Sequence, residues 1–243
     1  MARKPVRGLF ITSTDTGVGK TYAGALVAGA LAAQGHRVGV YKPAASGCSR
    51  DGDMLVSDDA LSLWKAAGSP ETLDEVCPQR FAAPLAPHLA AIAEGKRLDP
   101  ALLRRGLDVW LARSHIVLIE GAGGLMSPLG EEEYVADLAY DFGFPLLVVA
   151  RNGLGAINHV LQTLIAAAAF RDGLPVAGIV LNQTEPPGAD QSIEHNAREI
   201  RNRTISPLLA EIGFQASRFD PPVDWFRITA DPLRRHGVAA DDT

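Results

Sequence analysis

The residues between Ser13 and Thr21 have the types and the spacing needed to bind a phosphate group. They read Ser-Thr-Asp-Thr-Gly-Val-Gly-Lys-Thr. Glycines let backbone amides point at phosphate oxygens, a lysine supplies positive charge, and a threonine hydroxyl is a ligand for Mg²⁺. We therefore interpret this stretch as a phosphate-binding loop, with Lys20 as its charged residue and Thr21 as its metal ligand.

The beginning of this loop departs from the usual phosphate-loop pattern. In G-x-x-x-x-G-K-[ST] a glycine stands six residues before the lysine, where this chain has Thr14, and Ser13 is not glycine either. The alternative is a simple glycine turn between a strand and a helix. Gly-Lys-Thr at the expected start of the helix favours phosphate binding.

Further polar residues directly follow apolar runs that are typical of buried strands. Lys42 follows Val38 to Tyr41, and Glu120 follows the run 116–119 and precedes a glycine cluster. Because ligands of open parallel sheets bind at the carboxyl ends of the strands, we expect both residues near the phosphate loop. Glu120 resembles the acidic strand end that holds Mg²⁺ in nucleotide-hydrolysing proteins. The amides of Asn182-Gln183, after the run 176–181, are suited to the edge of a base.

Ordinary alternatives remain open for several of these residues. Lys42 can be a solvated lysine at a strand end, and Asp59 can be a helix cap. The glycine loop Gly153–His159 either holds an anion such as a carboxylate on its amides or only turns into a crossover helix. His88 has no second histidine at i+4 and no local cysteine, which disfavours a metal role. The pair Arg104-Arg105 indicates a solvated helix face.

The elements that must position these residues alternate between strands and helices. From Asp51 to Asp59 the chain is acidic and loop-like, beyond Pro207 the pattern weakens, and from about residue 220 the tail has no defined element. The alternation predicts an α/β fold, P-loop NTPase-like, with one doubly wound, mostly parallel sheet and helices on both faces, in a single domain over 1–243. Strands are expected at 9–11, 38–41, 116–119, 145–150 and 176–181, and helices at 23–33, 60–67, 89–94, 98–113, 134–142, 160–170 and 190–203.

Composition limits the class of protein. Hydrophobic residues make up 47% of the 243 residues and the formal net charge is −5, which is ordinary for a globular protein and gives no sign of a nucleic-acid surface. Cys48 and Cys77 lack metal-ligand spacing and are expected to be reduced thiols. No secretory signal is visible, and no apolar run reaches the ~18 residues of a membrane span. The expectation is a cytoplasmic enzyme.

Taken together, the motifs resemble those of the dethiobiotin synthetase family. The resemblance runs in the family's order from residue 8 to about 212. It rests on Thr14–Thr21, Tyr41-Lys42-Pro43, Ala45-Ser46-Gly47, Ser57–Leu61, Pro84–His88, Glu120–Gly124, Leu154-Gly155 with Ile157-Asn158-His159, and Asn182 with Pro186-Pro187-Gly188.

This resemblance implies a ligase of biotin biosynthesis. The family uses 7,8-diaminononanoate, CO₂ and MgATP, so the implied cofactors are ATP and Mg²⁺. An amine becomes a carbamate, the γ-phosphoryl group moves to the carbamate, and the second amine closes the ring as a cyclic urea. The resemblance also implies a homodimer with the substrate site at the interface.

The resemblance assigns a role to individual residues. Lys20, Lys42, Thr16 and Ser46 are the implied catalytic residues, and Thr21, Asp59 and Glu120 are the implied magnesium ligands. The implied nucleotide contacts are Asp15, Thr16, Gly17, Val18, Gly19, Lys20, Thr21, Tyr22, Glu120, Asn182 and Gln183; the implied substrate contacts are Ser46, Gly121, Gly153, Leu154, Gly155, Ala156, Ile157 and Asn158.

The chain departs from the family pattern in three places. Ser13 stands where the family usually has glycine, Gly17 where a glutamate can occur, and Gly213 where a proline is common. Two other functions compete with this one. An ATP-dependent amidotransferase or ligase of the same fold usually carries a glutaminase domain, which we do not find. A partitioning ATPase needs an additional lysine early in the loop, where this chain has Asp15.

Overall fold

The structure, a computed structural model, describes residues 6–186, 188 and 190–230. Two small two-stranded sheets accompany one large sheet. The strands are β1 (Arg7–Ser13), β2 (Val38–Tyr41), β3 (Ala44–Ala45), β4 (Ser49–Asp51), β5 (Met54–Val56), β6 (Gln79–Arg80), β7 (Ile116–Glu120), β8 (Leu146–Arg151), β9 (Val176–Asn182) and β10 (Leu208–Ile212).

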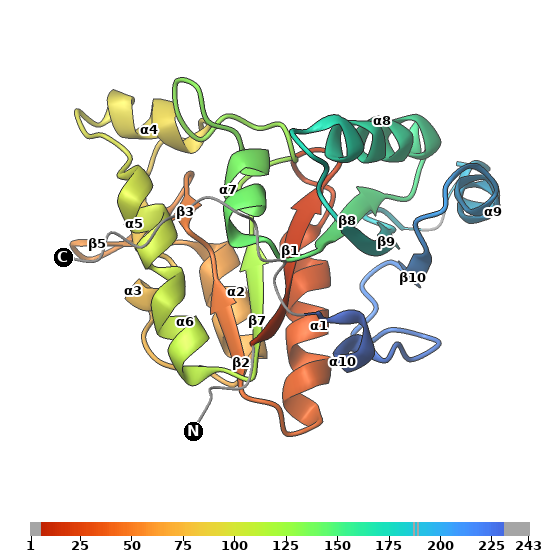
Figure 1. Ribbon diagram of the computed structural model, residues 1–243, viewed down its shortest axis with the longest axis horizontal. Coiled ribbons are helices and arrows are strands. Elements are labelled where there is room, and N and C mark those ends of the chain that lie inside the picture. The colour runs from red at the N-terminus through yellow and green to blue at the C-terminus, as the bar shows by residue number, and fades with distance from the viewer. Residues whose placement is uncertain (1–5, 187, 189, 231–243) are drawn as a thin grey trace.

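The large sheet has six strands in the order β10-β9-β8-β1-β7-β2, and every neighbouring pair is parallel. The order reverses at β1, from which the chain goes to β2 on one side and later returns to β8 on the other (Figure 1). β7 is buried along its whole length and β1 from Gly8 onward, because each is an almost continuous apolar run. The predicted doubly wound, mostly parallel sheet is confirmed.

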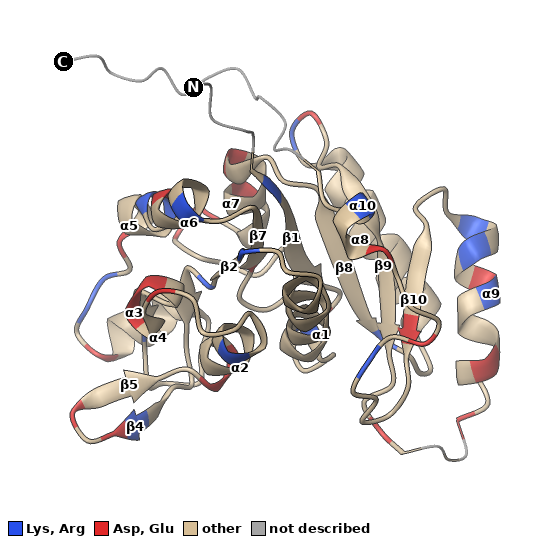
Figure 2. Ribbon diagram, turned by 90° about the horizontal axis from the view of Figure 1, so that it is seen from below, with Lys and Arg blue, Asp and Glu red and all other residues tan. Residues whose placement is uncertain are grey.

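Helices cover both faces of this sheet. In Figure 2, α1 and α2 lie on one face, and α6, α7 and α8 lie on the other. The helices are α1 (Lys20–Ala33), α2 (Asp58–Ala66), α3 (Leu73–Val76), α4 (Pro87–Ala93), α5 (Pro100–Arg105), α6 (Leu107–Arg113), α7 (Val135–Phe142), α8 (Ala156–Ala169), α9 (Ile193–Arg203) and α10 (Trp225–Ile228). None of the helices in the described ranges is long and apolar enough to cross a membrane.

The predicted helix 98–113 is wrong as a single element, because it is broken at Gly106 into α5 and α6. The Tyr41 ring packs so closely on Gly106 that a Cβ there would overlap it. The Tyr41 hydroxyl donates to the carbonyl of Leu103 at 2.8 Å. The Leu103 carbonyl, which would accept from residue 107 in a continuous helix, is thus bonded to a strand side chain.

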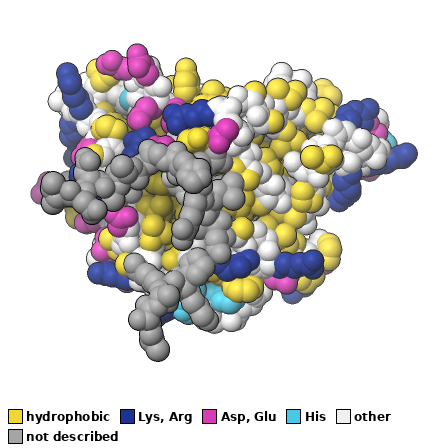
Figure 3. Space-filling model, in the orientation of Figure 1, with side chains coloured by type: hydrophobic (Ala, Val, Ile, Leu, Met, Phe, Trp, Pro, Cys, Tyr) yellow, Lys and Arg dark blue, Asp and Glu magenta, His cyan; other side chains and the backbone are white. Residues whose placement is uncertain are grey.

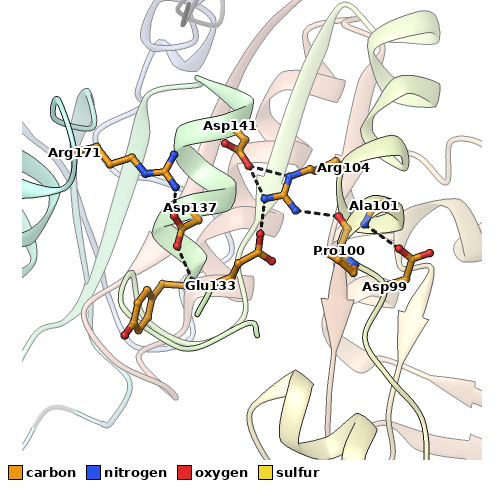
Figure 4. A network of polar contacts seen from close by, with 9 residues as sticks. Asp99, Pro100, Ala101, Arg104, Glu133, Asp137, Asp141 and Arg171 are labelled. Atoms are coloured by element: carbon orange, nitrogen blue, oxygen red, sulfur yellow. Dashed lines mark hydrogen bonds and ion pairs between the residues drawn. The ribbon is translucent and has the colours of Figure 1, made fainter. Parts of the chain in front are cut away.

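Arg104 is not the solvated residue that the sequence suggested. Its guanidinium donates to Asp141 at 2.6 and 2.9 Å and to Glu133 at 2.9 Å (Figure 4). These bonds join α5 to α7 and to the loop before it. Arg171 pairs with Asp137 of α7 in the same region. One arginine of the Arg104-Arg105 pair therefore has a structural role, which the sequence pattern of the helix does not reveal.

Two other segments differ from the expectation. The stretch predicted as an acidic loop, Asp51 to Asp59, instead contains most of an antiparallel hairpin, β4–β5, and the first two residues of α2. Beyond Pro207, β10 adds an edge strand whose half-exposed residues gave a weak pattern.

The beginning of the C-terminal tail is part of the fold. Trp225 is fully buried, and Arg7 donates to the backbone carbonyl and the hydroxyl of Thr229. The backbone groups of Gly8 and Ala230 pair with each other at 2.8 and 3.3 Å. Residues 1–5, Pro187 of the family motif, Ala189 and the tail from residue 231 lie outside the described residues.

Candidate functional site

The predicted phosphate loop connects β1 to α1. Gly17 and Gly19 have φ angles of 75° and 86°, a left-handed conformation that glycine adopts without strain. Gly19 is the N-cap residue of α1, so Lys20 and Thr21 form the first turn of the helix. The loop therefore ends at a helix N-terminus, as the sequence predicted for an anion-binding loop.

Three side chains surround one carboxylate oxygen, Glu120 Oε1: Lys20 and Thr21 come from the start of α1, and Lys42 directly follows β2. Lys42 Nζ lies 2.6 Å from it and Lys20 Nζ lies 3.6 Å from it. The Thr21 hydroxyl donates to the same oxygen at 2.8 Å. Lys42 Nζ also lies 2.9 Å from Asp59 Oδ2. The ends of β2 and β7 and the starts of α1 and α2 thus bring together residues up to 100 positions apart in the chain.

The alternative that Lys42 is a solvated lysine is excluded, because only 2% of the residue is exposed. Asp59 is not the cap of α2 either. Ser57 is that cap, and its hydroxyl accepts a hydrogen bond from the Ala60 amide at 3.2 Å. Asp59 lies in the first turn with 49% of its side chain exposed, free to face a ligand as well as Lys42.

Burial and charge act differently on the two lysines. Burial lowers the pKa of Lys20, since the attraction of Glu120 is offset in part by repulsion from Lys42. For Lys42 burial also lowers the pKa, but Glu120 and Asp59 together outweigh it and raise the pKa above its usual value. Burial raises the pKa of the Asp59 carboxyl, but the attraction and hydrogen bond of Lys42 lower it by more, so the pKa lies below its usual value. Lys42 is thus held charged by two close carboxylates, whereas Lys20 shares only Glu120, at the longer distance of 3.6 Å.

The oxygen atoms in this cluster suit a magnesium ion. Glu120 is 1% exposed, and its second oxygen, Oε2, has no hydrogen-bond partner within the described residues. An unpaired buried carboxylate oxygen is costly unless a cation or a donor satisfies it. Mg²⁺ prefers one or two carboxylates together with phosphate oxygens and water. Glu120, Asp59 and the Thr21 hydroxyl fit that ion. No cluster of three or more histidine, cysteine, aspartate or glutamate side chains occurs within residues 6–186, 188 and 190–230.

A cavity of about 570 Å³ opens in front of this cluster. Nine of the residues singled out from the sequence line it. These are Thr16, Gly17, Gly19, Lys20, Thr21, Tyr22, Lys42, Ser46 and Asp59.

A second cavity, of about 410 Å³, adjoins the first. The two share Thr16, Ser46 and the segment Ala122-Gly123. The far wall of the second cavity is the predicted family motif before α4, from Pro84 to Pro87. Two molecules, one bound in each cavity, would therefore lie next to each other beside the Thr16 and Ser46 hydroxyls.

The remaining predicted nucleotide contacts surround the loop. Asn182 is buried and donates through Nδ2 to the Val18 carbonyl at 3.0 Å, while its Oδ1 has no partner in the described part of the chain. The Gln183 amide pairs with the Ile212 carbonyl at 2.9 Å. Tyr22 donates its hydroxyl to the Ala216 carbonyl, which ties the start of α1 to the segment after β10. Val18 is buried, and Asp15 lines a cavity on the other side of the loop.

The predicted substrate-carboxylate loop is not part of the first cavity. Residues 153–158 follow β8, and none of them lines either cavity described above. Gly155 is the N-cap residue of α8 with a φ of 92°. The Leu154 amide donates to Asp190 Oδ2 at 2.9 Å, so the loop already holds a carboxylate of its own chain. Gly121 lies behind the site, against Phe10 and Val135.

Some lining residues were missed by the sequence analysis. Ala25 lies three residues after Tyr22 on α1, and Ser62 three residues after Asp59 on α2, so both share a helix face with a predicted residue. That spacing was the available signal. Asp58 and Ala45, which belong to the quoted family motifs but were assigned no role, also line the cavity.

Comparison with known proteins gives an independent result. A family model described as an AAA domain matches residues 7–217. An ATP-dependent dethiobiotin synthetase of Rhodopirellula baltica is 42% identical over 84% of this chain and 82% of its own. One of Anaeromyxobacter dehalogenans is 49% identical over 84% of this chain and 89% of its own.

Solved structures show the same fold at low identity. A ParA family ATPase from Chlorobium tepidum has a TM-score of 0.52 at 15% identity, covering 87% of this chain and 85% of its own. The predicted P-loop NTPase-like class is therefore confirmed. Because the more similar relatives match in sequence over most of both chains, the protein belongs to the ATP-dependent dethiobiotin synthetase family.

Proposed function

We propose that this protein makes dethiobiotin from 7,8-diaminononanoate and CO₂ at the expense of ATP. The observation that carries the proposal is that Lys20, Thr21, Lys42 and Asp59 line one cavity, in a chain of this family. The buried Glu120 joins Lys20, Thr21 and Lys42 from behind. Two anions, a carbamate and a triphosphate, must approach each other in this reaction. Catalysis therefore rests on positioning and on positive charge.

The proposed bond changes are as follows. One amine of the substrate attacks CO₂ and loses a proton, which gives a carbamate. A carbamate oxygen attacks the γ-phosphorus, and the bond to the bridging oxygen breaks to release ADP. The second amine then attacks the carbamate carbon, phosphate leaves with that oxygen, and the ring closes as a cyclic urea.

The two lysines have distinct parts in this proposal. Lys42 is held charged between Glu120 and Asp59, so it presents a fixed positive charge at the end of β2. Lys20, the first residue of α1, has only the longer contact to Glu120 and would gain a closer partner when phosphate binds. The Thr16 and Ser46 hydroxyls, shared by both cavities, would orient the carbamate and the phosphoryl group. Thr21, Asp59 and Glu120 would hold Mg²⁺, which would neutralise charge on the phosphates.

The nucleotide base is proposed to lie beside Asn182. Its unpaired, buried Oδ1 accepts a hydrogen bond, which an exocyclic amino group such as that of adenine can donate. Asn182 Nδ2 is already used by the loop, so the residue links base recognition to the phosphate loop. Gln183 and the loop amides from Asp15 to Tyr22 complete the proposed contacts.

We propose a homodimer, because the loop 153–158 does not line the cavities of its own chain. If this loop binds the substrate carboxylate, a second copy must bring it to the site. Leu154 within this loop is 89% exposed. Hydrophobic side chains gather over the part of the molecule that carries α8 and β8 (Figure 3). The free thiols Cys48 and Cys77 support a cytoplasmic place of action.

Complementation tests the shared site. Mixed dimers of Lys20→Ala and Gly155→Asp subunits should regain about a quarter to a half of the activity. In such a dimer one of the two sites combines the intact Lys20 of one subunit with the intact loop 153–158 of the other. Each variant alone should be inactive. Absence of recovery in mixtures shown to exchange subunits would contradict the shared site.

One incubation tests the function itself. Purified protein with MgATP, bicarbonate and 7,8-diaminononanoate should form one dethiobiotin for each ADP released. Omission of the diamine should reduce ATP turnover to background. ATP turnover that is indifferent to the diamine, with no cyclic urea formed, would instead favour a switch ATPase.

A further inference from the structure

Ser13, the last residue of β1, joins two segments that the proposed mechanism treats as separate. The residue is 1% exposed. Its hydroxyl oxygen lies 2.8 Å from the Asp15 carbonyl and 3.1 Å from the Gly123 carbonyl. A serine hydroxyl has a single hydrogen to donate, so the two carbonyls share it. Asp15 belongs to the phosphate loop, and Gly123 to the glycine segment after β7.

Segment 121–124 forms a wall of the site on the acceptor side. Ala122 and Gly123 line both cavities. The segment packs tightly on the end of β1, where a Cβ on Gly124 would lie 3.1 Å from the Ser13 carbonyl oxygen. That carbonyl accepts from the Leu125 amide at a long 3.3 Å. Within the described residues, one side-chain hydrogen bond joins residues 13–19 to this segment, and it runs from the Ser13 hydroxyl to the Gly123 carbonyl.

We infer that Ser13 is a positioning residue for the reaction, which fixes the phosphate loop relative to segment 121–124 and so aligns the nucleotide with its acceptor. The inference rests on the proposed function. Ser13 touches neither cavity, so it acts through the backbone of Asp15 and Gly123. Alignment of two bound reactants is worth a large factor in rate, and small displacements cost much of it.

Thr12 provides a matched control. It precedes Ser13 on β1 and is also fully buried. Its hydroxyl has no hydrogen-bond partner among the described residues. Thr12→Val and Ser13→Ala therefore each remove one buried hydroxyl from adjacent positions of the same strand. Only Ser13→Ala removes the link between the two segments.

The test compares steady-state kinetics of the full-length wild type, Ser13→Ala, Ser13→Gly and Thr12→Val. Both Ser13 variants should lose about tenfold in kcat for dethiobiotin formation, because the two segments lose the hydrogen bond that fixes their relative position. Their KM values for ATP and the diamine should stay within about threefold, because each binding surface is intact. Thr12→Val should keep all three constants within about twofold of the wild type.

Hydrogen exchange supplies a second readout that does not depend on activity. Amides of residues 121–127 should exchange faster in Ser13→Ala than in Thr12→Val. An unchanged kcat in both Ser13 variants, or a rise in KM with kcat preserved, would overturn the inference. A lower melting temperature with normal kcat would also overturn it. If the wild type makes no dethiobiotin, the proposed function fails instead, whatever the Ser13 variants do.

Discussion

Two glycine loops of this protein have nearly the same local structure and different surroundings. Each follows a parallel strand and opens a helix of 14 residues, α1 or α8. Each helix has a left-handed glycine as N-cap, with φ angles of 86° at Gly19 and 92° at Gly155, and neither helix has a side-chain cap. The backbone therefore offers the same helix N-terminus to an anion in both places.

The neighbours of the two loops differ. Lys20 and Thr21 open α1, and the adjacent strand ends add Lys42 and Glu120. The first turn of α8 carries no aspartate, glutamate, lysine or arginine side chain, and the Leu154 amide already donates a hydrogen bond to Asp190. Arg151 at the end of β8 lies beside the second loop, but it is half exposed and pairs with Glu185. We therefore propose the first loop as the phosphate site, because two lysines meet there. The second loop is suited at most to a singly charged group such as a carboxylate.

The largest effect is expected from removal of the charge on the first loop. Lys20→Ala should lower kcat by at least about 10³-fold, because the transferred phosphoryl group loses a fixed positive charge. Circular dichroism should show an intact fold. Lys65→Ala, an exposed lysine on α2, is the control and should keep full activity. Normal turnover by Lys20→Ala would remove this loop from the reaction.

A methyl group on each N-cap glycine tests whether the loops differ in packing. Gly19→Ala places Cβ in overlap with the Asn182 amide, whereas the nearest atom to a Cβ on Gly155 is 3.5 Å away. Gly155→Ala should cost only the left-handed strain, about 1–2 kcal/mol in free energy of unfolding. Gly19→Ala should cost more and should also abolish MgADP binding. Thermal unfolding and titration calorimetry measure both, and equal losses with retained binding would contradict the distinction.

Glu120→Gln tests the cation at the first loop. The amide keeps an acceptor for Lys42 and Thr21 but loses the charge that Mg²⁺ needs. We expect half-maximal activity to require about tenfold more Mg²⁺. The exposed Glu131→Gln is the control. An unchanged Mg²⁺ requirement would show that Glu120 is not a ligand.

The smallest effect is expected at the second loop. The pKa of Asp190 is lowered by hydrogen bonds from Ser192 and from the Leu154 amide, so this exposed carboxylate is charged at neutral pH. Asp190→Asn keeps an acceptor for that amide and removes the charge. The KM for the diamine should fall by up to about threefold, because a screened repulsion is removed, and the KM for ATP should not change. A tenfold rise in the diamine KM would show that the charge itself organises the loop.

The sequence was sufficient for the five buried strands next to the site and for most of the first loop's surroundings. Buried strands such as β7 and β9 are continuous apolar runs, and parallel pairing places their ends at one edge. Lys42 and Glu120 could be assigned to the same edge for that reason. The spacing of Ala25 and Ser62 on their helices would have added two lining residues.

Other features depend on tertiary contacts that no local pattern encodes. The break at Gly106 follows from the close approach of Tyr41, and Arg104 is a structural residue because α7 supplies its carboxylate partners. Loop 153–158 does not line the two cavities because of where β8 and α8 lie in the fold, and the sequence of the loop does not show this. The two hydroxyls of Thr12 and Ser13 are alike in sequence, and only the structure shows which of them is bonded.

The most direct test of the account is the fate of oxygen from CO₂. With C¹⁸O₂ supplied in short incubations with MgATP and 7,8-diaminononanoate, the account predicts one ¹⁸O in the phosphate released with each dethiobiotin. That oxygen is the carbamate oxygen that attacked the γ-phosphorus. Phosphate without ¹⁸O, formed alongside labelled dethiobiotin, would show that water and not the carbamate accepts the phosphoryl group, and would contradict the proposed use of this site.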